Sequence, residues 1–208
     1  MKNRRNKIDQ YCDVMEEIKR RKVVIDDFIT GKCKTPYKAT TLETICLQVR
    51  KILELIALGS LVANKKEFSK FHKDFHKYWH GGRILKDIEK INPRFYPEPI
   101  VEKQSSEPKI KTDLQPVKEG YLTKKDFIEV YNKCGAILHA DNPFGSKTDY
   151  SYYDRNISTW ITKIVKLLNT HIIYLLDDPN FYLIHLKEER DDKVHGYTFA
   201  PTQVKDGT

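Results

Sequence analysis

The residue in this sequence that is best suited to catalysis or ligand binding is His139, which ends a segment with the pattern of an amphipathic helix. It stands close to a turn, Asn142-Pro-Phe-Gly145, and Asn142 is a candidate for contact with a bound substrate. An imidazole in that place could transfer protons or contact a phosphate at the edge of a cleft. A histidine at the C-terminal end of a helix can also simply interact with the helix dipole. Both interpretations stay open at this point.

Arg50 and Glu54 are four residues apart inside the most apolar segment of the chain. Residues with this spacing lie on the same helix face and can form an ion pair. A buried charge must be paired or serve a purpose. The pair is therefore either a structural ion pair at the edge of a buried helix, or part of a substrate-binding site in which Arg50 faces a cleft and binds an anion.

Three histidines, His72, His76 and His80, follow one another at intervals of four residues. On a helix they share a face, and two such imidazoles can bind zinc or nickel. A straight helix cannot wrap three ligands around one ion, and no His-Glu-x-x-His pattern accompanies them. We interpret them mainly as a polar edge beside an aromatic stripe, and we predict no functional metal site and no cofactor.

Other common catalytic patterns are absent from the sequence. The serines lack a motif context, and the four cysteines are scattered and form no Cys-x-x-Cys pair. The sequence has no glycine-rich phosphate loop, and its adjacent carboxylates lie at the ends of predicted elements, where they are common. We therefore predict reduced structural cysteines and no catalytic triad.

Apolar residues recur at helical spacing over most of the chain. The spacing predicts long helices over residues 6–29, 40–63, 66–80, 123–139 and 152–176, and a shorter one over residues 83–91. The 40–63 helix begins with a capping box, Thr40-x-x-Glu43, and is apolar on nearly every face, as a helix in the middle of a bundle would be. A similar pattern, Thr123-x-x-Asp126, begins the helix that ends at His139.

The remaining segments have other signatures. Residues 92–120 carry five of the nine prolines and predict an extended connector. Residues 181–186 and 194–199 are rich in β-branched and aromatic residues and predict a β-hairpin that must pack on other elements to be stable. The expected fold is mainly α. We predict one domain over residues 1–208, a bundle of about five helices (1–91 and 121–178) with a C-terminal β-hairpin (180–200) packed on it.

Composition narrows the class of protein and of ligand. The chain has 208 residues, a formal net charge of +8 and 32% charged residues. No stretch approaches the roughly 20 apolar residues of a membrane span, and the basic N-terminus does not lead into an apolar segment. We expect a cytoplasmic protein with no membrane partner. The basic charge favours polyanions such as RNA, although the lysines are spread along the whole chain.

The segment Lys133-Cys-Gly-Ala-Ile-Leu-His139 resembles the motif of the HEPN superfamily, in which an Arg and a His stand on one helix near a dimer cleft. HEPN proteins are helical bundles, and their active members are metal-independent ribonucleases. The resemblance implies His139 as the general acid and base, Lys133 and Arg50 as phosphate-neutralising cations, and Asn132 as a positioning residue. Lys133 replaces the Arg of the family, and a lysine lacks the planar fork that makes two parallel hydrogen bonds.

Two functional hypotheses follow. The first is a HEPN-like protein that binds or cleaves RNA or another phosphate-bearing ligand, as a homodimer or with a partner protein, in a toxin–antitoxin or antiviral system. The second is a non-catalytic interaction or dimerisation protein, in which the altered motif marks lost activity. RNA binding across a salt series separates them, since phosphate contacts weaken steeply as salt rises. Residues 47–57, 134–144 and 160–169 are also similar to a group of uncharacterised bacterial proteins, and that similarity adds no function.

Overall fold

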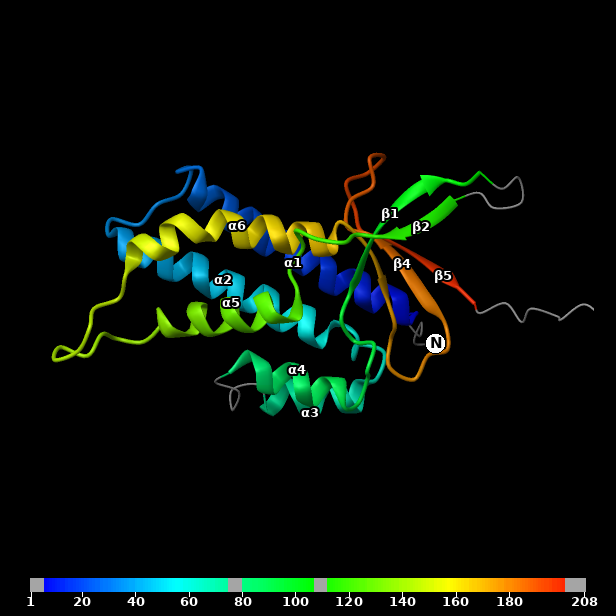
Figure 1. The fold of residues 1–208 in the computed structure, drawn as a ribbon, viewed down its shortest axis with the longest axis horizontal. Coiled ribbons are helices and arrows are strands. Elements are labelled where there is room, and N and C mark those ends of the chain that lie inside the picture. Colours follow the sequence, from blue (N-terminus) through cyan, green and yellow to red (C-terminus); the bar gives the residue numbers. More distant parts are fainter. Residues whose placement is uncertain (1–5, 75–79, 107–111, 201–208) are drawn as a thin grey trace, which may run out of the picture.

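The computed structural model describes residues 6–74, 80–106 and 112–200 of the chain. Helices fill one end of the molecule and an antiparallel sheet fills the other (Figure 1). The helices are α1 (Lys7–Ile29), α2 (Lys38–Gly59), α3 (Lys65–Asp74), α4 (Gly81–Glu89), α5 (Lys124–Ala136) and α6 (Tyr150–Leu168). The strands are β1 (Glu98–Gln104), β2 (Thr112–Pro116), β3 (Thr170–Ile173), β4 (Phe181–His185) and β5 (His195–Phe199). None of the helices in the described ranges is long and apolar enough to cross a membrane.

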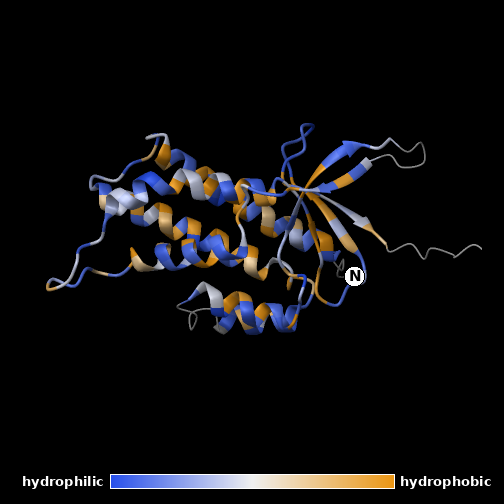
Figure 2. Ribbon diagram, viewed as in Figure 1, coloured by the Kyte–Doolittle hydropathy of each residue, from blue (hydrophilic) through white to orange (hydrophobic). Residues whose placement is uncertain are grey.

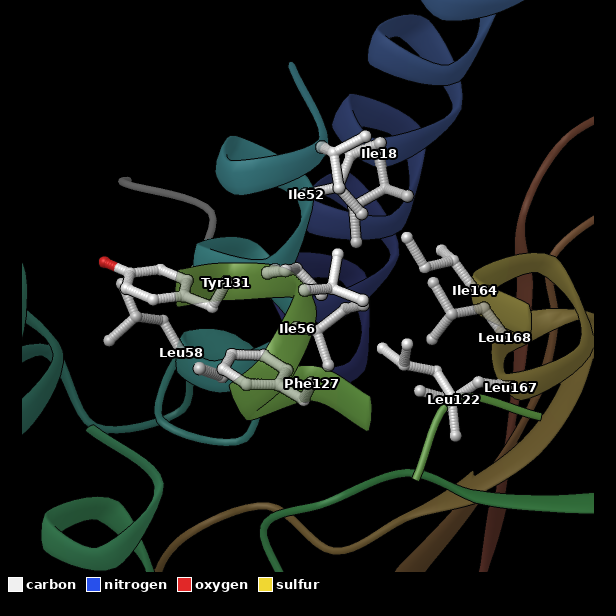
Figure 3. Close-up of a cluster of buried hydrophobic side chains, with 14 of the residues drawn as sticks. Ile18, Ile52, Ile56, Leu58, Leu122, Phe127, Tyr131, Ile164, Leu167 and Leu168 are labelled. Atoms are coloured by element: carbon white, nitrogen blue, oxygen red, sulfur yellow. The ribbon is translucent and has the colours of Figure 1, made fainter. Parts of the chain in front are cut away.

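α2 lies in the middle of the helical part and contacts α1, α3, α4, α5 and α6. Its apolar residues cover nearly all of its faces, so the prediction of a buried central helix is confirmed. The other helices carry apolar and polar stripes, as expected for amphipathic helices packed on one another (Figure 2). Ile18, Ile56, Phe127 and Ile164 bring one side chain each from α1, α2, α5 and α6 into a single cluster (Figure 3).

The five described strands form one sheet in the order β2-β1-β3-β4-β5, and all neighbouring strands are antiparallel. β4 and β5 form the hairpin that the sequence predicts, with Phe181 opposite Phe199. α1 packs on β5, and α6 packs on β1 and β3, so helices cover one face of the sheet. A Cβ added at Gly196 would lie 2.5 Å from Cγ1 of Ile8, which shows how closely β5 approaches α1.

Side chains alternate between the two faces of a strand, so the neighbours of Gly196 point away from α1. We call this second face the outer face. It consists of residues 172 and 174 in and after β3, residues 181, 183 and 185 in β4, and residues 195, 197 and 199 in β5. Tyr197 and Phe199 are 41% and 39% exposed there. The outer face is therefore a partly exposed surface that carries large rings.

The predicted mainly α fold is wrong, because the described chain combines six helices with a five-stranded antiparallel sheet. β1 and β2 occupy the segment predicted as a connector, where Ile100 lies opposite Pro116. β3 occupies the predicted end of the last long helix. Its sequence, Thr170-His-Ile-Ile173, keeps the apolar spacing of a helix, but its β-branched residues pair with β4 instead. The hairpin is thus the last two strands of a larger sheet.

The two predicted helix starts have different outcomes. Thr123 caps α5 as expected, since its hydroxyl accepts the N–H of Asp126 at 3.1 Å and the Asp126 carboxylate accepts the N–H of Thr123 at 3.0 Å. The capping box at Thr40 is wrong, because α2 begins at Lys38 with Tyr37 as its N-cap. The Thr40 hydroxyl instead donates to the Tyr37 carbonyl at 2.7 Å, inside the first turn.

A buried histidine joins the helical part to the sheet. In His171 of β3, Nδ1 lies 2.9 Å from the carbonyl oxygen of Leu168, and Nε2 lies 2.9 Å from the hydroxyl of Tyr11 in α1. A carbonyl oxygen can only accept, so Nδ1 carries the proton and Nε2 accepts from the Tyr11 hydroxyl. Burial lowers the pKa of His171 to about 4, so the imidazole is neutral at pH 7.

Candidate functional site

Arg50 reaches from α2 to α5, where it lies against Tyr131. Nη2 donates to the Tyr131 hydroxyl at 2.6 Å, Nη1 donates to the Tyr131 carbonyl at 3.3 Å, and Cζ lies 3.8 Å from the ring centroid. A Cβ added at Gly135 would lie 2.5 Å from Nη1, so the glycine leaves the space that the guanidinium occupies. The sequence could not reveal this contact, because 81 residues separate the two partners.

Glu54 adds a carboxylate to the same group. Its Oε1 lies 3.6 Å from Nε of Arg50, and its Oε2 lies 2.9 Å from Nζ of Lys51. The Arg50 and Glu54 side chains are only 18% and 17% exposed. Burial raises the pKa of Tyr131 to about 12, although the Arg50 charge opposes this, so the hydroxyl stays protonated at neutral pH. Contacts within the protein thus surround Arg50, which favours the structural interpretation of the pair.

The side chains of Lys133 and Asn132 point from α5 in directions that differ from that of Tyr131. Two residues along a helix turn a side chain by about 200°, so Lys133 points away from the side of Tyr131. Its Nζ lies 4.8 Å from the ring centroid of Tyr152 in α6. The Oδ1 of Asn132 accepts the N–H of Gly81 at 3.0 Å and thereby caps the start of α4. The structure therefore gives Asn132 a role in helix packing that the sequence did not predict.

His139 and Asn142 lie in the exposed loop between α5 and α6. α5 ends at Ala136, and the backbone N–H of His139 donates to the Ala136 carbonyl at 3.2 Å in the turn that follows. The Oδ1 of Asn142 accepts the N–H of Phe144 at 3.0 Å, which stabilises the turn predicted there. The candidate residues of the sequence thus lie in the Arg50 group, on the far side of α5, at the start of α4 and in this loop.

Of the three evenly spaced histidines, two lie in the described ranges. His72 and His80 are exposed, and His76 lies outside the described residues. The His72 ring stacks on Phe68 with the two centroids 5.9 Å apart. No group of three or more His, Cys, Asp or Glu residues in the described part of the chain could hold a metal ion.

Replacing Arg50 with alanine should lower the free energy of unfolding by about 2 kcal/mol, because Tyr131 loses a cation–π contact and a hydrogen bond, and Glu54 loses its half-buried partner. Arg50→Lys should recover less than half of this loss, since an ammonium group cannot reproduce the planar contacts. Urea unfolding measures both, with Lys51→Ala on the exposed side of α2 as the control, expected within about 0.5 kcal/mol of wild type. Wild-type stability in Arg50→Ala would contradict a structural role.

The chain matches no protein-family model, no curated protein and no solved structure. The HEPN resemblance, with the dimer and the defence system that it implies, therefore stays a prediction from residues 133–139.

Sequence reasoning missed a group of rings on the outer face. Phe181 and Phe199 stack with their centroids 5.1 Å apart and an interplanar angle of 8°. Phe181 also lies 6.2 Å from Tyr174, and Cζ of Arg94 lies 3.3 Å from the Tyr174 ring centroid. We call Arg94, Tyr174, Phe181 and Phe199 the aromatic row. It runs from the segment before β1 to the edge strand β5, across the end of the molecule opposite the α5–α6 loop (Figure 1).

The guanidinium of the aromatic row is held in place by an ion pair. Nη2 of Arg94 donates to both carboxylate oxygens of Glu98, at 3.0 and 3.2 Å, and Nε donates to one of them at 3.3 Å. These hydrogen bonds fix the guanidinium over Tyr174. An arginine plane held in this way can itself serve as a stacking surface.

Beyond the rings, the outer face carries two histidines with carboxylate partners. Nδ1 of His185 lies 2.5 Å from Glu188, and the Tyr197 hydroxyl donates to the same carboxylate at 3.0 Å. These two hydrogen bonds lower the pKa of Glu188. His195 lies directly opposite His185, with its Nε2 at 3.0 Å from Asp191. His185 and His195 thus each make a hydrogen bond to a carboxylate on this face.

Proposed function

We propose that this chain binds single-stranded RNA on the outer face of its sheet and does not cleave it. The aromatic row carries the proposal, because it places one guanidinium and three rings side by side on a partly exposed sheet. Unstacked bases bind such surfaces, since every base has a flat face that can stack on an aromatic ring or on a guanidinium plane. The bases of a duplex are stacked on one another and cannot use it.

The net charge of the chain supports the same class of ligand. A charge of +8 attracts a polyanion, and phosphate contacts supply most of the sequence-independent affinity of nucleic-acid-binding proteins. The basic residues are distributed over the whole chain, so they provide a general attraction and no single site. The aromatic row provides the local contact that would hold the strand in one place.

The positions of the sequence-derived candidates support the non-catalytic form of the proposal. Metal-independent RNA cleavage requires a proton-transfer group and a cation at the same phosphate. Arg50 is held by Tyr131, Lys133 points to α6, and His139 lies beyond the end of α5. These three groups would have to meet at one phosphate for the HEPN-type chemistry to operate.

Fluorescence anisotropy tests the proposal with a single-stranded RNA of about 12 nucleotides and a hairpin duplex of similar length. We expect the single strand to bind at least about tenfold more tightly, since each base stacked on a ring contributes about 1–3 kcal/mol. Binding should weaken steeply as salt rises. Equal affinity for the two RNAs would contradict stacking on the sheet, and no binding at low salt would favour the interaction protein.

The same samples test the absence of cleavage. RNA incubated with wild type and with His139→Ala should stay equally intact on a denaturing gel, because Arg50 is bound to Tyr131 on α5 and His139 lies in the loop after α5. Cleavage by wild type that disappears in His139→Ala would contradict the non-catalytic proposal and restore the ribonuclease hypothesis.

A further inference from the structure

A cleft lies beside the aromatic row, between the segment that enters β1 and the segment that joins β2 to α5. Its volume is about 520 Å³, which is within the range of small-molecule sites. It is bordered by residues 93–94, 96–100, 114, 116–117, 121, 123–124 and 172. Residues of three strands and the start of one helix thus surround one small space.

The floor of the cleft is apolar and held from several sides. Ile100, Leu114 and Ile172 contribute side chains from β1, β2 and β3, and four prolines stand around them. The ring of Tyr96 is fixed because its hydroxyl donates to the Leu122 carbonyl at 2.8 Å. Prolines and paired strands lose little freedom when a ligand binds, so this wall is already formed for a flat apolar group.

Two cations, each paired with a carboxylate, lie at the rim of the cleft. Lys124, the first residue of α5, places Nζ 2.5 Å from Glu89 and 4.9 Å from the ring centroid of Phe95. Arg94 borders the cleft on the other segment and also belongs to the aromatic row. Both side chains are at least two-fifths exposed, so an anionic group at the mouth can reach them without burying a charge. Arg94 makes the cleft continuous with the outer face.

We propose that this cleft binds a single nucleotide, with the base on the apolar floor and the phosphate at Lys124 and Arg94. The combination of a flat apolar wall and two cations fits a molecule that has an aromatic ring at one end and an anion at the other. The inference deepens the proposed RNA binding, because the cleft adjoins the aromatic row. A free mononucleotide suffices to occupy it, so the two proposals can fail separately.

Isothermal titration of the whole chain with AMP tests the cleft, with adenosine and inorganic phosphate as the two half-ligands. AMP should bind more tightly than either half, because only AMP contacts both the floor and the cations. Leu114→Glu should weaken AMP binding by about tenfold or more, since it removes apolar wall and adds a like charge near the phosphate. Lys124→Gln should weaken it by about fivefold, as expected for loss of an exposed ion pair.

Matched controls stand outside the cleft. Val101→Glu places the same charge on the opposite face of β1, and Lys147→Gln removes a lysine from the α5–α6 loop. Both should leave AMP affinity unchanged. The inference is overturned if AMP does not bind wild type at millimolar concentration, if inorganic phosphate binds as tightly as AMP, or if the controls weaken binding as much as the cleft variants do. Unaltered circular dichroism of each variant shows that the fold is intact.

The source of the nucleotide follows from the same variants. Weaker binding of single-stranded RNA by Leu114→Glu and Lys124→Gln would show that the cleft holds a nucleotide of the strand, and unchanged RNA binding would show that it holds a free nucleotide. Both results support the cleft as a nucleotide site. Binding of RNA without binding of AMP would overturn the cleft and leave the proposed function standing. Binding of AMP without binding of RNA would contradict the proposed function and support the cleft as a nucleotide site.

Discussion

Replacing Phe181 and Phe199 together with alanine is expected to weaken the binding of single-stranded RNA by about 10- to 100-fold, because each ring that stacks a base contributes about 1–3 kcal/mol. The two rings form one parallel stack, so the open side of that stack is the natural place for a base. When both rings are removed, only Tyr174 and Arg94 of the aromatic row remain as stacking surfaces. Anisotropy titrations at constant salt measure the change.

The control for the ring variant is Phe144→Ala. Phe144 is 97% exposed in the α5–α6 loop, so its removal deletes an equally large ring at a distant place. RNA affinity should stay within about twofold of wild type in this variant, because surface substitutions away from a site have little effect. The thermal midpoint of each variant shows whether the sheet is intact. If the double variant Phe181→Ala, Phe199→Ala is folded and keeps wild-type RNA affinity, the outer face is not the RNA-binding surface.

Acidification should lower the stability of the folded protein through His171. Folding holds His171 neutral, and burial lowers its pKa to about 4, from about 6.5 in the unfolded chain. As the pH falls below about 6.5, the unfolded chain takes up a proton that the folded protein excludes, so stability is lost progressively down to the folded pKa. The stability present above pH 6.5 should therefore fall by about 2–3 kcal/mol by pH 4.5 from this group alone.

A double variant isolates this contribution. Tyr11→Phe with His171→Leu removes both members of the buried hydrogen bond and leaves no titrating group there, although the Leu168 carbonyl loses its donor. Urea unfolding at pH 7.0, 5.5 and 4.5 should show a shallower loss of stability in the double variant than in wild type. Phe144→Ala, which changes an exposed side chain that does not titrate, should keep the wild-type slope. Parallel slopes in wild type and the double variant would show that His171 is not the acid-sensitive group.

The helical part of the fold could be predicted because its signals are local. α2 is apolar on nearly every face, and α5 begins at a capping box only four residues long, so neither needs information from distant segments. β1 and β2 lie in a proline-rich segment with little alternation, and they become strands by pairing with each other and with β3. β3 itself continues the apolar spacing of α6, and its pairing with β4 decides its structure.

The candidate site was harder to predict, because its contacts join distant residues. The spacing of Arg50 and Glu54 correctly indicated an ion pair, but Tyr131, which fills most of the space around Arg50, is on another helix. Lys133 and His139 have the spacing of a motif, yet Lys133 turns to the opposite side of α5 from Tyr131. Part of the aromatic row could have been predicted from the sequence, since alternation in the predicted hairpin already places Phe181 and Phe199 on one face.

Nuclear magnetic resonance can show which residues of the chain contact single-stranded RNA. Single-stranded RNA is added to the ¹⁵N-labelled chain, and the shifted backbone amides are placed on the structure. We expect them to cluster in residues 172–174, 181–185 and 195–199, on and beside the outer face. Shifts confined to residues 132–142, around Lys133 and His139, would contradict RNA binding on the outer face and would show that RNA binds at the helical motif instead.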